Sequence, residues 1–311
     1  MAILGMTPNA TSQPKRRDWA ALDRQHQRRG TLAFTLLLNP DVLKPPVRKV
    51  GRGRPQRYTD TFVEALLMMR VALRLPYREL EGAARAIFQS HGLDPEQVPD
   101  HTLLCKRQSQ LSPRLPAFRP GEHTCLLVDS TGLKVAGYGE WNTRQHGVQG
   151  RRTWVKVHLL TDAATGQIID LAVTPPTEGD SPVFEQLVEG KDLAGVTTIG
   201  DGAYDSKRCY SAVHAAGGRH LAPPKMGAMR WDRKVPAYRQ RNRHIDNIHL
   251  VGRPAWKKWA KYHRRSAVES AMHRWKWVTG ERALSRTLTR LKVEGVLRAK
   301  FLNSLIASTA D

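Results

Sequence analysis

One acidic residue stands out in a basic stretch near the C-terminal end of the chain. Residues 261–276 are rich in Lys and Arg and contain a single carboxylate, Glu269. At the period of an α-helix, Arg265, Glu269 and Lys276 fall on one helical face, with Tyr262 on the same side. An exposed helix whose Glu269 forms salt bridges would explain this pattern. A carboxylate among cations also suits phosphoryl chemistry on a polyanion, provided that further carboxylates join it.

Two more acids follow apolar runs that are typical of buried strands. Asp129 follows residues 124–128, and Asp201 follows residues 196–200. Acids commonly end strands in turns, but residues past the ends of neighbouring strands also converge at one edge of a sheet. Carboxylate oxygens favour Mg²⁺, with Mn²⁺ as a substitute, over zinc. We therefore expect Asp129, Asp201 and Glu269 to be catalytic metal ligands, which in two-metal sites hold ions about 3.5–4 Å apart for an in-line phosphoryl displacement.

The net charge of +22 is unevenly distributed along the 311 residues. Residues 1–60 contain 12 Lys and Arg against 4 acids, residues 61–205 contain 14 against 18, and residues 206–310 contain 24 against 5. Two basic flanks around a slightly acidic middle indicate surfaces for a polyanion. Nucleic acid is favoured over an anionic membrane because the sequence has no lipid anchor and no long basic amphipathic helix.

Several classes of protein are disfavoured by the sequence. No apolar run reaches the roughly 18 residues of a membrane span, and the N-terminus lacks the order of a secretory signal. We expect a cytoplasmic protein associated with the nucleoid. Three widely spaced cysteines argue against a disulfide framework and a structural zinc site, so they are expected to be buried thiols.

The first 118 residues divide into two parts. Residues 1–58 are interpreted as a basic arm and linker, in which Arg52 and Arg54 stand in a Gly-Arg-Gly-Arg-Pro run suited to a DNA minor groove. A solvated linker is the alternative. Residues 59–118 predict three helices, at about 59–74, 77–89 and 100–109, as in a helix-turn-helix unit. Lys106 and Arg107 on the third helix would contact DNA, although many small helical bundles share this layout.

Residues 119–311 alternate between strand and helix patterns. Strands are predicted at about 124–128, 153–160, 168–173, 196–200 and 220–222, and a helix is expected to start with Ser181 as its cap. Further helices are expected up to about residue 216 and over 261–276, with a basic, weakly periodic insertion at 225–260. This order predicts an α/β domain with a mixed central sheet flanked by helices.

The spacing of the C-terminal motif resembles a known family signature. Tyr262, Arg265, Glu269 and Lys276 match the Tyr-Arg-Glu-Lys signature of bacterial insertion-sequence transposases of the DDE type. Asp129 before Ser-Thr and Asp201 before Gly-Ala-Tyr-Asp occupy the places of that family's first two acids. The chain is most similar to insertion-sequence family five, related to family four, over roughly residues 18–308.

This resemblance implies a fold, a reaction and a set of partners. It implies a ribonuclease-H-like catalytic domain with acids on the first strand, the fourth strand and the last helix. It also implies binding to the transposon terminal inverted repeats and target DNA, metal-dependent cleavage and strand transfer, and a homodimer on DNA. Arg265 and Lys276 would contact phosphates, and Tyr262 would contact a displaced base or sugar or else face the core. The alternatives are a ribonuclease-H-fold nuclease without strand transfer and a non-catalytic DNA-binding regulator derived from a transposase.

Overall fold

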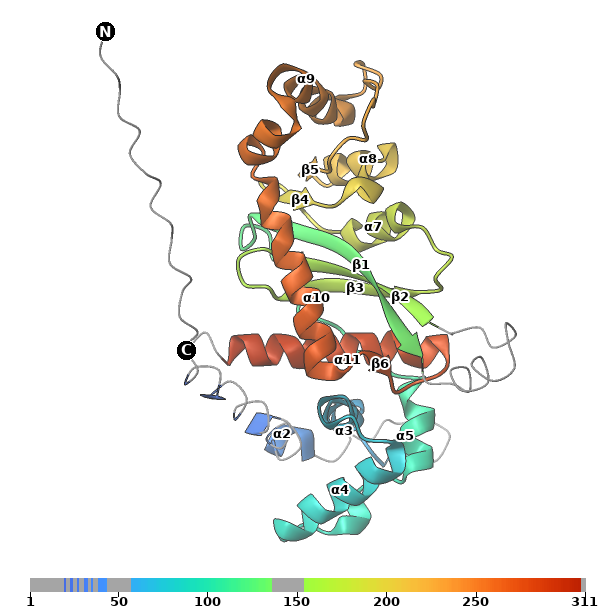
Figure 1. Cartoon of the computed structure of the whole chain (residues 1–311). Helices are drawn as coiled ribbons and strands as arrows, with labels where there is room; N and C mark the ends of the chain where they lie inside the picture. Colours follow the sequence, from blue (N-terminus) through green and yellow to red (C-terminus); the bar gives the residue numbers. More distant parts are fainter. Residues whose placement is uncertain are drawn as a thin grey trace, which may run out of the picture.

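The computed structural model describes residues 57–135, residues 154–308 and a few positions between 20 and 43. Arg52, Arg54 and the polar tract at 137–152 lie outside the described residues. The N-terminal part contributes one short described helix, α2 (Pro40–Leu43). Figure 1 shows the remaining elements as a helical unit, a central sheet with helices on both faces, and a helical arm at the far end.

The helical unit is formed by α3 (Asp60–Leu73), α4 (Tyr77–Ser90) and α5 (His101–Gln108). Two of these helices begin at side chains that accept hydrogen bonds from free backbone N–H groups. Thr59 accepts from the N–H of Phe62, and Asp100 accepts from two N–H groups of α5. The three helices predicted for this region are therefore confirmed, with bounds that differ by one or two residues.

The sheet has six strands in the order β3-β2-β1-β4-β5, with β6 pairing against β1. The strands are β1 (Cys125–Val135), β2 (Trp154–Asp162), β3 (Ile168–Thr174), β4 (Thr197–Ile199), β5 (Arg219–Leu221) and β6 (Arg282–Ala283). The β1–β2 and β2–β3 pairs are antiparallel, whereas β1–β4 and β4–β5 are parallel. This mixed sheet, flanked by helices, is the α/β architecture predicted from the sequence.

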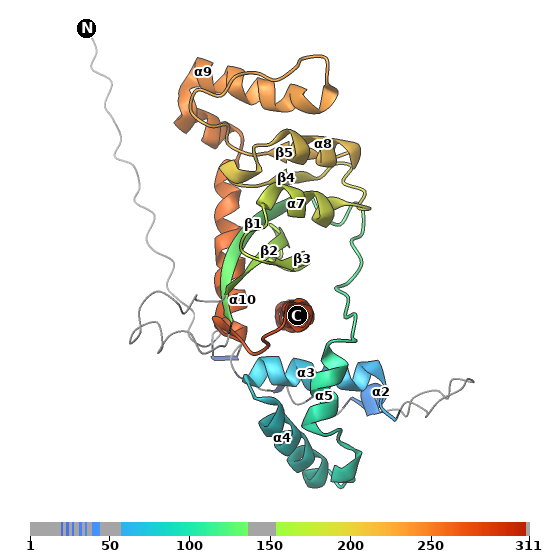
Figure 2. The same cartoon turned by 90° about the vertical axis from the view of Figure 1, so that its right-hand side faces the viewer.

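Alternation along β1 creates the two apolar faces of the sheet. Leu126 and Val128 pack into a core with α7 (Asp180–Val188) and α8 (Lys207–Ala215). Leu127 belongs to the other core, which includes residues of α10 (Ser266–Thr279) and α11 (Leu288–Ala307). Figure 2 shows α10 on one side of the strands and α7 on the other.

The core around α11 continues into the helical unit. Phe62 and Leu66 of α3 belong to the same buried cluster as Leu297 and Phe301 of α11. The two regions therefore share one hydrophobic core, and the division at residue 118 stays a prediction about function.

A buried charged network strengthens this junction. Glu294 and Arg298 of α11 form an ion pair at 2.6 Å with side chains 1% and 0% exposed. Glu294 also accepts hydrogen bonds from the N–H groups of Leu284 and Ser285, at 2.9 and 2.7 Å. Arg298 donates to the carbonyl oxygens of Gly280 and Arg282. The Glu294 carboxylate and the Arg298 guanidinium thus both have hydrogen-bond partners, as buried charged groups require.

A basic arm extends from the sheet beyond β5. Its main element is α9 (Arg239–Trp259), which bends at Gly252, where φ is 80° and ψ is 159°. Arg241 anchors the arm because its guanidinium forks onto both oxygens of Asp205, at 2.6 and 2.9 Å, and lies 3.7 Å from the centroid of the Trp231 ring. None of the helices in the described part of the chain is long and apolar enough to cross a membrane.

The structure corrects several expectations about individual elements. Asp129 lies inside β1 rather than beyond its end, because β1 continues through Ser130 and Thr131 in register with β2. Ser181 is not a helix cap, since α7 begins one residue earlier behind Gly179. The stretch 261–276 is not one helix. It consists of a 3₁₀ turn, η4 (Tyr262–Arg265), followed by α10.

Glu269 is therefore on the penultimate helix, because α11 follows it. The sequence patterns did not predict α9 or α11. All three cysteines are free, and Cys125 and Cys209 are buried, as expected.

Candidate active site

The register between β1 and β4 places the first two acids side by side. Leu127 pairs with Ile199 in the parallel ladder, so Asp129 and Asp201, each two residues further on, reach the same level on the same face. Asp201 comes directly after β4 and caps the 3₁₀ turn η2 (Gly202–Tyr204), accepting from the N–H of Ala203 at 2.8 Å. Two acids 72 residues apart in sequence thus meet at one edge of the sheet.

Helix α10 brings the third acid to this edge. Val268 and Met272 are buried against the sheet core, which leaves the intervening Glu269 with a side chain that is 64% exposed. Arg265 connects the acids. Its Nη1 lies 2.6 Å from Oε1 of Glu269, and its Nη2 lies 3.5 Å from Oδ2 of Asp129. One guanidinium thereby links two of the three acids predicted from the sequence, Asp129 and Glu269.

The pKa of Asp129 reflects its burial and the charged side chains around it. Burial raises the pKa of the Asp129 carboxyl above its usual value, because it disfavours the charged form. The N–H of Ser130, at 2.8 Å, and the Arg265 guanidinium oppose that shift. The charges of Asp201 and Glu269 raise the pKa further, so both acids are close enough to act on Asp129. Repulsion among like charges at a half-buried position favours a bound cation.

The three carboxylates are suitable ligands for a hard divalent cation, but their side chains are not close enough together to bind one jointly. All three acids offer carboxylate oxygens, the ligands that Mg²⁺ and Mn²⁺ prefer. Within residues 57–135 and 154–308, no three His, Cys, Asp or Glu side chains are grouped closely enough to hold a metal ion. The Arg265 guanidinium lies between two of the acids instead. Carboxylates must therefore move if they are to share an ion.

A cavity of about 460 Å³ opens beside Glu269. It is lined by Lys257, Lys258, Tyr262 and Arg265, among others. The Tyr262 ring is stacked on Trp256 with 5.9 Å between centroids, and burial raises its pKa. This cavity combines cations, an aromatic ring and a carboxylate, which is a suitable combination for a nucleotide phosphate and its sugar or base.

Sequence comparison identifies the protein class to which this geometry belongs. A family model described as "Transposase DDE domain" matches residues 120–304, which is more than half of the chain and includes all three acids. The chain belongs to the DDE transposase family. A second model with the same description matches residues 27–138. DDE transposases depend on divalent metal ions, in agreement with the carboxylate donor set.

Solved structures of DNA-processing enzymes show distant similarity to this transposase. A piggyBac transposase synaptic complex with hairpin DNA has 12% identity and a TM-score of 0.42, with 89% of this chain and 74% of that chain covered. The Mos1 mariner paired-end complex with Mn has 12% identity and a TM-score of 0.22, with 85% and 88% covered. The catalytic core domain of BIV integrase has 11% identity and a TM-score of 0.22, with 55% and 94% covered.

The remaining residues singled out in the sequence lie in contrasting settings in the transposase. Lys276 is half-buried on α10 and forms no ion pair with any described residue. Lys106 is exposed on α5. Arg107 has a side chain that is only 12% exposed and forms an ion pair with Asp60. A DNA contact by Arg107 would require it to leave that partner, so its assignment stays a prediction.

Tyr204 is a residue of the site for which the sequence suggested no role. Its hydroxyl is buried and has no hydrogen-bond partner among the residues that the structure describes, and burial and the nearby charges of Asp180, Asp129 and Asp201 raise its pKa. Its ring lies against the backbone at Gly200, where a Cβ atom would be 2.7 Å from the ring. The motif Ile-Gly-Asp-Gly-Ala-Tyr could have signalled this contact. The sequence analysis also did not single out Lys257 and Lys258, because nothing in the sequence distinguishes them from the other basic residues of 225–260.

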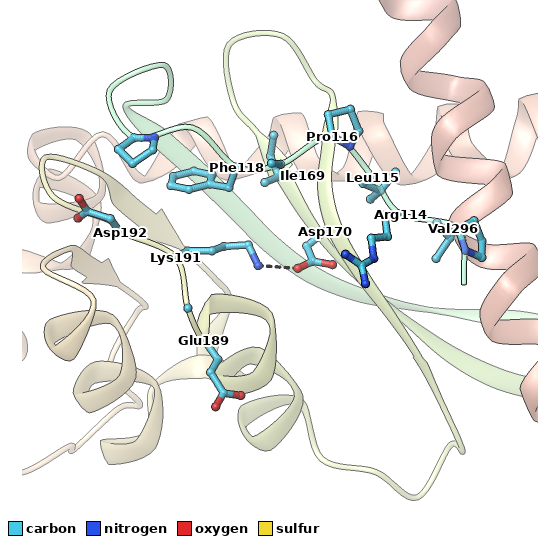
Figure 3. A pocket seen from close by; sticks show the side chains of 14 residues that line it. Arg114, Leu115, Pro116, Phe118, Ile169, Asp170, Glu189, Lys191, Asp192 and Val296 are labelled. Atoms are coloured by element: carbon cyan, nitrogen blue, oxygen red, sulfur yellow. Dashed lines mark hydrogen bonds and ion pairs between the residues drawn. The ribbon is translucent and has the colours of Figure 1, made fainter. Parts of the chain in front are cut away.

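A second cavity of the transposase, of about 570 Å³, lies next to the edge strand β3. Figure 3 shows Asp170 of β3 reaching toward Lys191, with Phe118 and Ile169 nearby. The Lys191–Asp170 ion pair measures 2.5 Å, so this acid is already neutralised. None of the residues predicted as catalytic lines this cavity, which leaves the edge near Asp129 as the candidate active site.

Proposed function

We propose that this DDE transposase binds the terminal inverted repeats of its insertion sequence and catalyses strand cleavage and strand transfer with Mg²⁺. One observation carries the proposal: within a sequence that matches a DDE domain, the β1–β4 register brings Asp129 and Asp201 to the same level, and Arg265 links Asp129 to Glu269. The spacing of Tyr262, Arg265, Glu269 and Lys276 supports membership of insertion-sequence family five.

In this proposal the three carboxylates have a common role. Asp129 lies in β1, Asp201 directly follows β4, and Glu269 lies in α10, and a shared divalent cation would draw their oxygens together. When bound there, Mg²⁺ supplies Lewis-acid stabilisation of both the attacking and the leaving oxygen in an in-line displacement. The protein contributes rigid supports on a β-strand and a helix, which position ligands more accurately than loops do.

The DNA would lie along the basic side of the site. Lys257 and Lys258 line the cavity beside Glu269, and Lys276 lies about two turns further along α10 from the acid. Further back along the chain, α9 and the loop before it carry exposed cations, among them Lys225, Arg233, Lys234, Arg239 and Arg243. Such a surface binds phosphates irrespective of base sequence. Lys106 on α5, and Arg52 and Arg54 in the N-terminal arm, are proposed as further contacts for recognising the repeats.

The partners follow from the reaction. Both ends of an insertion sequence have to be held while they are joined to target DNA, so two copies of the chain are expected on the DNA. The substrate is double-stranded, and the place of action is the bacterial nucleoid in the cytoplasm.

The decisive experiment incubates the purified full chain with Mg²⁺ and DNA carrying the terminal repeats of the element. Joined products support transposition, nicked products alone indicate a nuclease without strand transfer, and bound but uncut DNA indicates a regulator. Asp129→Asn should remove all products. Asp170→Asn is the matched control, because Asp170 belongs to the same sheet but is paired with Lys191 away from the site.

A further inference from the structure

Arg265 contacts two acids, and these acids would have to release it in order to bind a metal ion. Its guanidinium spans Glu269 on its own helical segment and Asp129 on β1, at 2.6 and 3.5 Å. The side chain is only 21% exposed. One cation therefore neutralises two acids that would otherwise repel each other.

The oxygens of Asp129 are both engaged in this arrangement. Oδ1 accepts a hydrogen bond from the N–H of Ser130 at 2.8 Å, and Oδ2 faces Arg265. A divalent cation would use Oδ2 and an oxygen of Glu269, which are close to the same guanidinium. Two cations compete for one pair of carboxylates, and bringing both into contact with them costs repulsion.

Arg265 also has a second place in which to bind. It lines the 460 Å³ cavity together with Lys257, Lys258 and Tyr262. Its Nε is buried and has no hydrogen-bond partner among the described residues. A guanidinium with a free N–H next to a basic cavity is well suited to a phosphate, which accepts two parallel hydrogen bonds from Arg.

We propose that Arg265 is a positioning residue that substitutes for the metal charge between Asp129 and Glu269 without DNA, and releases Asp129 to a divalent cation when a DNA phosphate binds its guanidinium. The proposal rests on the proposed function for its substrate, DNA. It makes DNA binding and metal binding mutually favourable, because each ligand removes an obstacle to the other. Chemistry would thereby be confined to protein that already holds DNA.

Mn²⁺ titrations of the full chain, followed by the electron paramagnetic resonance signal of free Mn²⁺, test this coupling. The wild-type protein should bind Mn²⁺ at least about fivefold more tightly with duplex DNA than without it, the low end of typical coupling between sites. Arg265→Ala should raise the affinity for Mn²⁺ without DNA to a similar extent and should lose most of the effect of DNA. Arg265→Lys keeps the positive charge but lacks the two parallel N–H donors of a guanidinium. Its affinity for Mn²⁺ without DNA should lie between those of the wild type and Arg265→Ala.

Arg208→Ala is the matched control, because Arg208 also pairs with a carboxylate, that of Glu185 at 3.3 Å, but on α8 rather than beside Glu269. Its affinity for Mn²⁺ without DNA should equal that of the wild type. The proposal is overturned if DNA leaves the Mn²⁺ affinity of the wild type unchanged, or if Arg208→Ala raises it as much as Arg265→Ala. Mn²⁺ binding that survives Asp129→Asn would also overturn it. If strand transfer fails, the proposed function is contradicted, but the Mn²⁺ binding measurements still test the proposal about Arg265.

Discussion

Two Glu–Arg pairs in this transposase have the same helical spacing and opposite surroundings. Arg265 ends η4 directly before α10, Glu269 lies in the first turn of α10, and Glu294 and Arg298 lie within α11, the members of each pair being four residues apart. The α11 pair is almost completely buried, and its carboxylate accepts two backbone N–H groups in addition to the arginine. In the α10 pair the carboxylate is 64% exposed, and Arg265 is its only hydrogen-bond donor among the described residues.

The contrast separates an acid that holds the fold from one that is available to a ligand. The Glu294 carboxylate has no capacity left to bind a further ligand, because two backbone N–H groups, Arg298 and Arg70 surround it. Glu269 has lone pairs left over, and Arg265 links it to the carboxylate of Asp129. A carboxylate without enough partners of its own is the better candidate for a metal ligand.

The largest effect is expected from the acids of the site. Asp129→Ala, Asp201→Ala and Glu269→Ala should each abolish cleavage and joining, a loss beyond the roughly 10–100-fold that follows removal of an outer partner of a metal ligand. DNA binding should remain nearly intact, because each change also removes repulsion with phosphate. Product formation on end-bearing DNA and binding in gel-shift assays measure the two quantities. Normal activity of any one variant would mean that its acid is not part of the site.

Glu294→Ala should produce the largest change in stability. It would leave Arg298 buried without its charge partner, so the free energy of unfolding should fall by about 3–5 kcal/mol. Urea denaturation followed by circular dichroism measures this loss. The comparison with Glu269 fails if Glu269→Ala lowers the stability by a similar amount.

The buried histidines should behave like the α11 pair, as groups that belong to the fold. Burial lowers the pKa values of His158, His220 and His244 from 6.5 to about 4. The unfolded chain therefore binds protons that the folded chain excludes, so stability is full above pH 6.5 and is lost as the pH falls toward 4. Each histidine should contribute on the order of 1–3 kcal/mol of this loss. Urea denaturation at pH 7 and pH 5 checks the direction, and equal midpoints would contradict it.

Lys276→Ala should weaken the binding of cognate and random DNA alike. Loss of one phosphate contact reduces the slope of log affinity against log salt by about 0.9. A salt titration with random-sequence DNA measures the slope, and Lys191→Ala is a suitable control, since Lys191 is paired with Asp170. An unchanged slope would remove Lys276 from the set of DNA contacts.

The smallest effect is expected for the α10 pair as a stabilising element. Arg265→Ala should change the free energy of unfolding by only about 0.3–0.5 kcal/mol, as is usual for a partly exposed pair with this spacing. Thermal and urea denaturation measure the change. A loss as large as that of Glu294→Ala would show that both pairs hold the fold, and the contrast between them would disappear.

The sequence predicts best those elements whose ends are marked locally. Thr59 and Asp100 cap their helices as their residue types indicate. Strands β1 to β5 were predicted from apolar runs and alternation, whereas the two-residue strand β6 was not. The end of β1 was placed too early because its apolar run stops at Val128, whereas pairing with β2 extends the strand to Val135.

Two helices were missed for reasons that lie in their tertiary contacts. Helix α9 contains Gly252 and Pro254, and its buried side chains include Arg241 and His244, so no apolar face is visible in the sequence. The buried residues of helix α11 are mostly apolar and include Leu297 and Phe301, but Glu294 and Arg298 interrupt them.

The acids of the site were predicted from residue type and family resemblance, but their arrangement was not. The contact between Arg265 and Asp129 joins residues 136 positions apart, and no local pattern reports it. Its origin is the parallel β1–β4 register together with the packing of α10, both of which depend on long-range contacts.

The core shared by α3 and α11 limits how this transposase can be recombined with its relatives. A chimera joined at residue 118 would combine α3 from one parent with α11 from another, although the buried side chains of the two helices belong to one cluster and the helices are in contact. Mismatched shapes in a buried interface typically cost several kcal/mol through cavities or overpacking. Modular exchange of the helical unit should therefore succeed only when α11 is transplanted with it, so these distant segments are expected to be inherited together.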